Sequence, residues 1–488
     1  MTLALNKQND IKVNNAISML KKYYLNDKRS FCVAFSGGKD STAVLYLIIK
    51  MLEELKQDDI LPTKTVYIVN SNTLAELPPV LKHLKHTLDQ IELFAKDNNL
   101  PIIVQEVFPE LKNTLNVQLL GVGMPPPSSS LRWCTDKLKI MPIDSKLKEI
   151  FPDGAFISVI GTRSDESTDR ANRMERATLK GTNLKLNNRY PKASNLMPIE
   201  DWSTKDVWEY ILKQNNDLVN IDFLWKLYSD ASNKDASECT FTGAGGKNIE
   251  EGKLGCGTSR FGCWQCYMVR DKDKSLDGLM QSGHDNIEHY KAYRDWFWER
   301  TQQGWEKTRD VYSHNHQIQT FYNKGGKDNP KYGMTVPRGL TLKLRKEAFK
   351  KTLELQSKLS ETIITEDEII EIQKRWILEG DLNLSAFREA RKYNYKLNTF
   401  NLPLKIRQNI KDAKHFYKKK LLNNKKYFHI LTLQRFAIQN ITNNTKIQNK
   451  FFPSKDEEKL IKKEWVRGKK INQSINFSYL EMSSNMPN

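Results

Sequence analysis

The sequence has few cysteines and no long hydrophobic run, and each absence excludes a class of protein. Six cysteines in 488 residues are too few for the disulfide framework of a small secreted protein. No run of 18 or more apolar residues occurs, so we expect no membrane span. The segment from Met1 to Asp10 is polar and lacks the apolar core of a signal peptide. The sequence therefore predicts a cytoplasmic protein without a membrane partner.

Acidic residues are also in deficit. The chain has 77 Lys and Arg against 58 Asp and Glu, a formal net charge of +19. From Asp381 to Asn488 there are 23 basic and 8 acidic residues, a net charge of +15, so most of the excess lies in the last fifth. Such a segment indicates a polyanionic partner, most often nucleic acid. A solvated tail rich in Lys and Asn has the same composition, and charge alone leaves both interpretations open.

The most informative segment is the hexapeptide Ser36–Ser41. It follows the apolar run Phe31–Phe35 and precedes a helical pattern from Thr42 to about Leu55. This order is typical of a strand–loop–helix unit. The unpaired N–H groups at a helix N-terminus bind phosphate, and glycines let the backbone approach it closely. We therefore expect a nucleotide phosphate site made of Ser36, Gly37, Gly38, Lys39, Asp40 and Ser41.

This hexapeptide is not a Walker-type loop. Val33 stands where that motif requires its first glycine, and Asp40 follows the lysine. An ordinary tight turn would explain two adjacent glycines. The complete Ser-Gly-Gly-Lys-Asp-Ser pattern between a strand and a helix favours phosphate binding.

Residues 1–215 alternate between strand-like and helix-like segments. Strands are expected at 31–35, 65–69, 101–107 and 156–160, with a long amphipathic helix between the second and third. This alternation predicts an α/β fold with a mainly parallel sheet and helices on both faces. Ligands bind beyond the carboxyl ends of the strands in such sheets. Asn70, Asn72 and Gly161 follow expected strands and should join the loop in one crevice.

The remaining sequence divides by composition into three segments. Residues 216–280 are rich in cysteine and glycine, 281–380 form an aromatic-rich helical region, and 381–488 form the basic C-terminal extension. Helical patterns are expected at about 341–358 and 365–378. Before them, Ser203 and Asp206 have the spacing of a capping box that opens a helix.

Four cysteines lie close together in the second segment: Cys239, Cys256, Cys263 and Cys266. Four thiolates complete a tetrahedral zinc site or ligate a [4Fe–4S] cluster. The spacing does not separate these two metals. Unligated cysteines are the less probable alternative given this crowding.

A fifth cysteine, Cys134, lies among basic residues that include Arg132 and Lys139. Nearby cations and a helix start lower the pKa of a thiol, so we predict a nucleophile or sulfur carrier. A scaffold role beside an anion site or a metal cluster stays open. Cys32, within the first strand, is expected to be a small buried hydrophobe.

Several motifs together resemble known families. The hexapeptide resembles the pyrophosphate loop of the ATP-pyrophosphatase, or PP-loop, superfamily, whose fold is adenine-nucleotide alpha-hydrolase-like. Three further motifs resemble the PAPS-reductase branch of this superfamily. They are Arg132-x-Cys134 with Lys139 and Pro142, Gly161-x-Arg163 with Glu166, and Pro198-x-x-Asp201-Trp202. The segment Cys256–Cys266, followed by Asp273-Lys274-Ser275, is similar to DndC, the sulfurtransferase family of bacterial DNA phosphorothioation. The resemblance covers roughly residues 25–380.

The resemblance implies an activity, cofactors and partners. Family members hydrolyse ATP to AMP and pyrophosphate, carry a [4Fe–4S] cluster on four cysteines, take sulfur from a cysteine desulfurase, and act on DNA with other Dnd proteins. It therefore favours iron–sulfur over zinc. No cysteine follows Cys266, which counts against a thioredoxin-coupled PAPS reductase. An APS or PAPS reductase, a tRNA-thiolation enzyme, and a nucleic-acid-binding scaffold with a structural metal are the alternatives.

The expected mechanism begins with ATP in the loop, where Mg²⁺ neutralises the phosphate charge. A DNA phosphate oxygen attacks the α-phosphate, pyrophosphate leaves, and a sulfur nucleophile then displaces AMP. Positioning and charge stabilisation should supply most of the catalysis. The residues expected to be catalytic are Lys39, Asp40, Arg132, Cys134 and Arg163.

Overall fold

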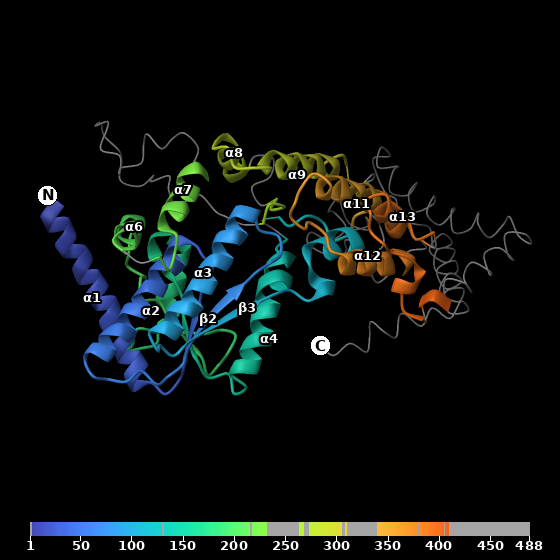
Figure 1. The fold of residues 1–488 in the computed structure, drawn as a ribbon. Coiled ribbons are helices and arrows are strands. Elements are labelled where there is room, and N and C mark those ends of the chain that lie inside the picture. The colour runs from blue at the N-terminus through green and yellow to red at the C-terminus, as the bar shows by residue number, and fades with distance from the viewer. Residues whose placement is uncertain are drawn as a thin grey trace, which may run out of the picture. The chain divides into compact units, whose positions relative to one another are not determined.

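The protein was analysed as a computed structural model (Figure 1). The structure describes residues 2–128, 131–166, 168–214, 217–231, 263–267, 273–304, 308–309, 339–378, 381, 383–404 and 406–408. The chain divides into two compact units. The first contains Met1–Glu110 and Pro127–Lys291, and the second contains Leu111–Pro126 and Ala292–Asn488. The four segments expected from composition stay a prediction.

The first unit is built on a six-stranded sheet with the order β3-β2-β1-β4-β6-β5. All neighbouring strands are parallel except β5, which pairs antiparallel with β6. Phe31 lies opposite Val66 on one side and Ile157 on the other. The α/β fold with a mainly parallel sheet is therefore confirmed. The strands are β1 (Phe31–Ala34), β2 (Val66–Ser71), β3 (Ile102–Val107), β4 (Ile157–Val159), β5 (Leu184–Leu186) and β6 (Ser194–Leu196).

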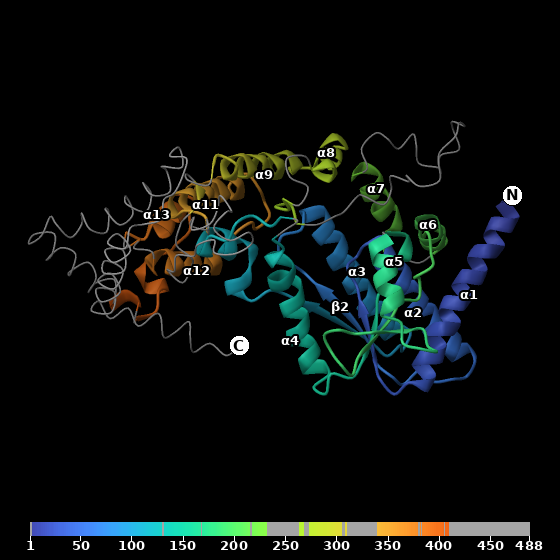
Figure 2. The ribbon, with the colours of Figure 1, turned by 180° about the vertical axis from the view of Figure 1, so that it is seen from behind.

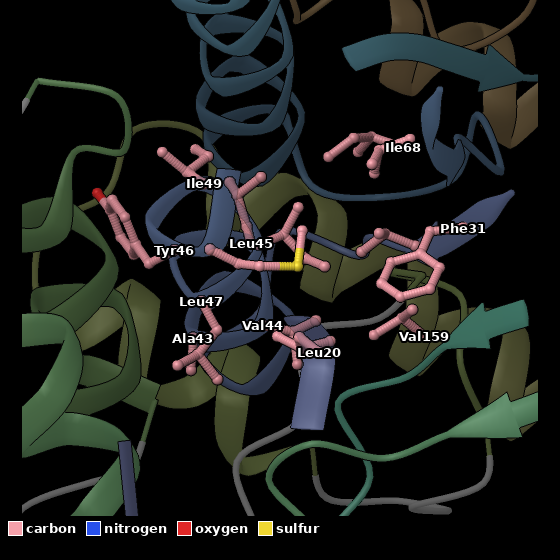
Figure 3. Close-up of a cluster of buried hydrophobic side chains, with 14 of the residues drawn as sticks. Leu20, Phe31, Ala43, Val44, Leu45, Tyr46, Leu47, Ile49, Ile68 and Val159 are labelled. Atoms are coloured by element: carbon pink, nitrogen blue, oxygen red, sulfur yellow. The ribbon is translucent and has the colours of Figure 1, made fainter. Parts of the chain in front are cut away.

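One face of this sheet carries the larger hydrophobic core. Phe31 points into it, and Leu20, Val44 and Val159 join it from other elements (Figure 3). Val33, also of β1, belongs to the same core. Side chains alternate across a strand, so Cys32, which lies between Phe31 and Val33, faces the opposite side of the sheet. The helices that supply this core are α1 (Thr2–Asn26), α2 (Lys39–Gln57), α3 (Pro78–Asp97) and α6 (Thr204–Leu212). Of these, α1 was not expected from the sequence.

The opposite face is covered by α4 (Met141–Ile150). Leu147 and Phe151 pack there with Cys32, Val69 and Phe156. In Figures 1 and 2, α4 lies across the strands from α1 and α2. Helices therefore cover both faces of the sheet, and the expectation that Cys32 is a buried hydrophobe is confirmed, since it is 5% exposed.

Further elements of the first unit surround the carboxyl edge of the sheet. A π-helix, η3 (Thr135–Ile140), and a short 3₁₀ turn, η4 (Ser164–Glu166), precede α5 (Thr168–Arg176). Two more helices follow, α7 (Ile221–Ala231) and α8 (Lys274–Gln281), and they pack against each other. The expected capping box is present: the Asp206 N–H donates to Ser203 Oγ over 3.2 Å, and the Ser203 N–H donates to Asp206 Oδ2 over 2.7 Å.

The second unit is helical. The Trp376 indole N–H donates to the Leu120 carbonyl over 2.8 Å, and buried Arg345 donates to the Gly121 carbonyl over 2.6 Å. These bonds tie Leu111–Pro126 to helices more than 200 residues later in the chain. The expected helices at 341–358 and 365–378 are confirmed. The elements are η1 (Leu111–Asn113), η2 (Val117–Val122), α9 (Ile287–Thr301, shared with the first unit), α11 (Leu342–Gln356), α12 (Glu366–Leu378), α13 (Ser385–Arg391) and η8 (Thr399–Asn401).

Among the residues that the structure describes, no helix combines the length and the apolar character needed to cross a membrane. Most of the basic C-terminal extension, from residue 409 onward, lies outside the described residues.

Candidate functional site

The glycines shape the loop between β1 and α2. Gly37 has a φ of +71°, a conformation that favours glycine, and a Cβ at this position would lie 2.9 Å from Leu84 Cδ1. Gly38 is the extended N-cap residue of α2 and, as a glycine, supplies no capping side chain. The N-terminal N–H groups of α2 therefore meet the loop, as phosphate binding requires.

Two serines close the loop internally. Ser41 Oγ lies 3.2 Å from Ser36 Oγ and accepts the Ser36 N–H over 3.3 Å. It also donates to the Gly38 carbonyl over 2.9 Å. These short-range bonds hold both ends of the hexapeptide together and fix the curvature of its backbone.

Asp40 is held between two buried cations. Its Oδ2 lies 2.7 Å from Lys39 Nζ, and its Oδ1 accepts from Arg163 Nε over 2.7 Å. The Arg163 side chain is 2% exposed and also donates to the Trp202 carbonyl and to Thr204 Oγ1. Arg163 therefore orients Asp40 in this structure.

Gly161, after β4, makes the closest approach to the loop. A Cβ added there would lie 2.7 Å from the Asp40 carbonyl oxygen and 3.1 Å from the Ser41 nitrogen. Asn70, at the end of β2, is buried and donates to the Phe35 carbonyl over 2.8 Å. The structure thus brings Gly161, Arg163 and Asn70 to the loop.

Asn72 is placed differently. Its amide donates to Glu106 Oε1 over 2.9 Å, while its Oδ1 accepts the Leu74 N–H over 2.9 Å. One end of its side chain therefore ties the turn after β2 to β3, and the other end closes that turn. Its role in nucleotide binding, like the other predicted roles, stays a prediction.

Tyr228, on α7, meets the loop from a distant part of the sequence. The Lys39 backbone N–H donates to Tyr228 Oη over 3.4 Å, and Lys39 Nζ lies 5.6 Å from the centre of the tyrosine ring. The Trp208 ring packs edge-on against this ring at 5.3 Å. Burial raises the pKa of Tyr228 to about 12, so the phenol is neutral at physiological pH. No local pattern in the sequence marks this residue.

The Cys-x-x-Cys turn is anchored to the segment after β2. Cys263 forms a β-bridge with Glu76, and the Trp264 N–H donates to the Ala75 carbonyl over 2.9 Å. The Cys266 N–H donates to the Cys263 carbonyl over 2.9 Å, which closes the turn. The phosphate loop and this cysteine turn therefore lie beyond the carboxyl ends of two adjacent parallel strands, β1 and β2.

The Cys263 thiol is enclosed. It lies 3.4 Å from Thr73 Oγ1, whose own hydroxyl is also 2.5 Å from Glu76 Oε1. Burial, followed by the Glu76 carboxylate, raises the pKa of Cys263 to about 12. In the absence of a ligand the thiol is therefore protonated at neutral pH.

The Cys134 thiol interacts electrostatically with the Cys266 thiol. The prediction that basic neighbours lower the pKa of Cys134 is wrong in this structure. Burial, followed by Cys266, raises that pKa above its ordinary value. Arg132 is exposed, and the structure shows no ion pair from it to the loop among the described residues. Nothing in the sequence spacing indicated that Cys134 lies beside Cys266.

The predicted metal ligands are only partly described. Cys263 and Cys266 share one turn, whereas Cys239 and Cys256 lie outside the described residues. In the described part of the chain, no three His, Cys, Asp or Glu side chains are arranged to hold a metal ion. Two sulfurs on a Cys-x-x-Cys turn are nevertheless the donor type that zinc and iron–sulfur clusters take.

Comparison with known proteins agrees with this geometry. Residues 30–267 match the family model of the phosphoadenosine phosphosulfate (PAPS) reductase domain. This region is therefore similar to that domain. Its boundaries enclose the sheet, the phosphate loop, α7 and the cysteine turn.

Individual relatives are more distant. An uncharacterized protein of Methanocaldococcus jannaschii is 27% identical over 41% of this chain, and the match spans only 35% of that relative. A PAPS reductase from Candida auris has a TM-score of 0.28 at 15% identity, covering 41% of this chain and 79% of its own. The U34-tRNA thiolase NcsA of Methanococcus maripaludis, with its [4Fe–4S] cluster, has a TM-score of 0.27 at 13% identity. The match covers 59% of this chain and 80% of that chain. No argument about activity rests on these two structures.

Proposed function

We propose that this protein is an ATP-dependent sulfurtransferase that converts a DNA backbone phosphate to a phosphorothioate. One observation carries the proposal: a glycine loop at a helix N-terminus and a cysteine turn follow adjacent strands of a PAPS reductase-like domain. Nucleotide activation and sulfur chemistry need such neighbouring sites. DNA as the acceptor is the finer part of the proposal, and the basic extension supports it through its charge.

The first step is adenylation of the acceptor. The β- and γ-phosphates bind the N–H groups of Gly38 and Lys39 and the helix dipole, which leaves the α-phosphorus exposed. A non-bridging oxygen of the DNA phosphate attacks this phosphorus, a P–O bond forms, and the bond to pyrophosphate breaks. The same donors stabilise the charge that develops on the leaving pyrophosphate. Asp40 and Arg163 keep the Lys39 side chain in place.

The second step introduces sulfur. A nucleophile at the oxidation level of hydrosulfide attacks the adenylated DNA phosphorus, a P–S bond forms, and the P–O bond to AMP breaks. A cysteine desulfurase is the proposed sulfur source, and other Dnd proteins are the proposed partners. The desulfurase delivers a persulfide, and a thiol reductant, which becomes a disulfide, brings its outer sulfur to the hydrosulfide level. Cys263 and Cys266, with Cys239 and Cys256, would hold a [4Fe–4S] cluster, which would supply one-electron redox chemistry beside the sulfur site. Cys134 lies where a sulfur carrier could deliver to that turn.

The rival function is reduction of a sulfonucleotide, which the family model itself favours. That reaction releases sulfite from PAPS or APS and leaves ATP intact. Sulfite production by the purified protein with either sulfonucleotide would therefore replace our proposal with this one.

The deciding experiment identifies the products of ATP. We expect AMP and pyrophosphate, resolved by phosphorus NMR or ion-exchange chromatography, and not ADP and phosphate. Lys39→Ala should abolish this cleavage, because it removes a buried cation beside the phosphate site. Lys50→Ala is the matched control, since Lys50 is an exposed residue of the same helix. Equal activity of the two variants would remove the loop from the mechanism.

A second measurement identifies the acceptor. Nuclease digestion and mass spectrometry of DNA from cells that express the protein with its partners should reveal phosphorothioate dinucleotides. Lys39→Ala should eliminate them. Thiolated tRNA nucleosides that depend on Lys39, with unmodified DNA, would assign the same chemistry to a tRNA base instead.

A further inference from the structure

Tyr228 reaches the phosphate loop from α7 and engages the donor that a nucleotide would need. Its Oη accepts the Lys39 backbone N–H over 3.4 Å, and this N–H belongs to the first residue of α2. The same oxygen would lie 3.2 Å from a Cβ on Gly38. The phenolic oxygen therefore lies against the backbone of the two residues at the start of the helix.

An N–H group has one favourable direction for an acceptor. A phosphoryl oxygen that binds this N–H at an ordinary distance of about 2.9 Å must enter the space that Tyr228 Oη now takes. Two other loop donors are also engaged, since the Ser36 N–H bonds to Ser41 Oγ and Lys39 Nζ bonds to Asp40. Of these acceptors, only Tyr228 comes from outside the hexapeptide, 189 residues further along the chain.

We propose that the Tyr228 hydroxyl occupies the position of a phosphoryl oxygen in the nucleotide-free protein and must give way when nucleotide binds. This inference rests on the proposed function and adds a residue that sets nucleotide affinity. A charged phosphoryl oxygen forms a stronger bond with a backbone N–H than a neutral phenol does. The exchange is therefore favourable for a nucleotide.

The surroundings of Tyr228 keep the hydroxyl in place. Trp208 of α6 packs edge-on against the Tyr228 ring, with 5.3 Å between ring centres. It also packs edge-on against Trp225, which lies on α7 like Tyr228, with 4.9 Å between ring centres. On a neighbouring turn of α7, Phe223 stacks on His83 of α3 at 5.0 Å. These contacts hold α7 on two sides. The Tyr228 phenol therefore presents its oxygen to the loop without a large loss of side-chain entropy on folding.

Tyr228→Phe isolates the hydroxyl. Phenylalanine keeps the ring that faces Lys39 Nζ and the contact with Trp208, so packing is preserved. Loss of one neutral hydrogen bond to the empty protein should tighten binding of inorganic pyrophosphate by about threefold to fivefold in calorimetric titration. The KM for ATP should fall by the same factor with little change in kcat.

Tyr210→Phe is the matched control. It removes the hydroxyl of a buried tyrosine on α6 that has no hydrogen-bond partner among the described residues, and it should leave pyrophosphate affinity unchanged. Weaker or equal pyrophosphate binding by Tyr228→Phe would overturn the inference. If ATP still yields AMP and pyrophosphate in that case, the proposed function stands without it. Absence of that cleavage in the wild type would instead reject the function.

Discussion

Gly161→Ala tests whether the end of β4 supports the phosphate loop. The added methyl group would lie 2.7 Å from the Asp40 carbonyl oxygen, 2.8 Å from its carbon and 3.1 Å from the Ser41 nitrogen. An ordinary contact begins at 3.4 Å, so the two backbones must separate by about 0.7 Å. All three atoms belong to the backbone, and therefore no side-chain rotation can relieve the clash.

The expected cost follows from the size of this displacement. Overpacking a well-packed site lowers the free energy of unfolding of a protein by about 1–3 kcal/mol. For a domain of this size each kcal/mol lowers the Tm by about 2–4 °C. Catalysis should suffer more, because misplacing reactive groups by about 1 Å costs up to about a hundredfold in rate. We expect Gly161→Ala to lower AMP and pyrophosphate production by at least about tenfold.

The assay combines a thermal melt with ATP product analysis. Gly121→Ala is the control, since a methyl group there meets its nearest neighbours at 3.4 Å or more and the backbone of Gly121 has no positive φ. Its Tm should change less than that of Gly161→Ala. A Gly161→Ala protein with the wild-type Tm and full ATP cleavage would refute the close approach that the structure shows.

Three further predictions concern charge, pH and metal. Asp40→Asn should destabilise the protein by about 3–5 kcal/mol in urea unfolding, because it removes the carboxylate between two buried cations and leaves Arg163 only its exposed acidic partner, Asp165. Burial lowers the pKa of His83 from 6.5 to about 4, so the folded protein resists its protonation. The neutral His83 therefore contributes on the order of 3 kcal/mol to the free energy of unfolding above about pH 6.5, and this contribution disappears as the pH falls toward 4. His83→Gln should flatten this pH dependence of stability. Cys263→Ser should remove the visible absorption of anaerobically purified protein if the turn holds an iron–sulfur cluster.

Each of these has a matched control. Asp58→Asn breaks an exposed pair with Lys21 and should cost under about 1 kcal/mol; a similar cost for Asp40→Asn would contradict the buried network. His86→Gln, at an exposed position of α3, should keep the pH dependence that His83→Gln loses. Cys32→Ser, on the face of the sheet that packs against α4, should keep the absorption. Wild-type protein that is colourless and holds one zinc would exclude the cluster.

The strands and the phosphate loop could be predicted because their signals are local. The apolar run at 31–35 became β1, and the amphipathic pattern from Leu77 to Ile91 became α3. In contrast, β5 and β6 have three residues each, too few for a recognisable alternation. The helix α1 was missed because its first ten residues are polar and its apolar face is weak.

The site was predicted unevenly for the same reason. Lys39 and Asp40 could be placed from their own neighbourhood, yet the sequence could not show that Asp40 is already bonded to Arg163. Cys134 was expected to carry a lowered pKa from nearby basic residues, whereas burial and Cys266 raise it. Basic residues adjacent in sequence contribute little when their side chains are exposed to solvent, as Arg132 and Lys139 are.

By itself, the sequence determined that residues 31–57 form a strand, a glycine loop and a helix whose first N–H groups are available to an anion. Backbone sterics and the spacing of apolar residues act over a few residues, so they can be read directly from the chain. Only the tertiary structure decided which distant groups meet that loop: Arg163 on Asp40, Gly161 against its backbone, and Tyr228 at Lys39. These contacts follow from the order of strands in the sheet and the packing of α7, which depend on the whole core.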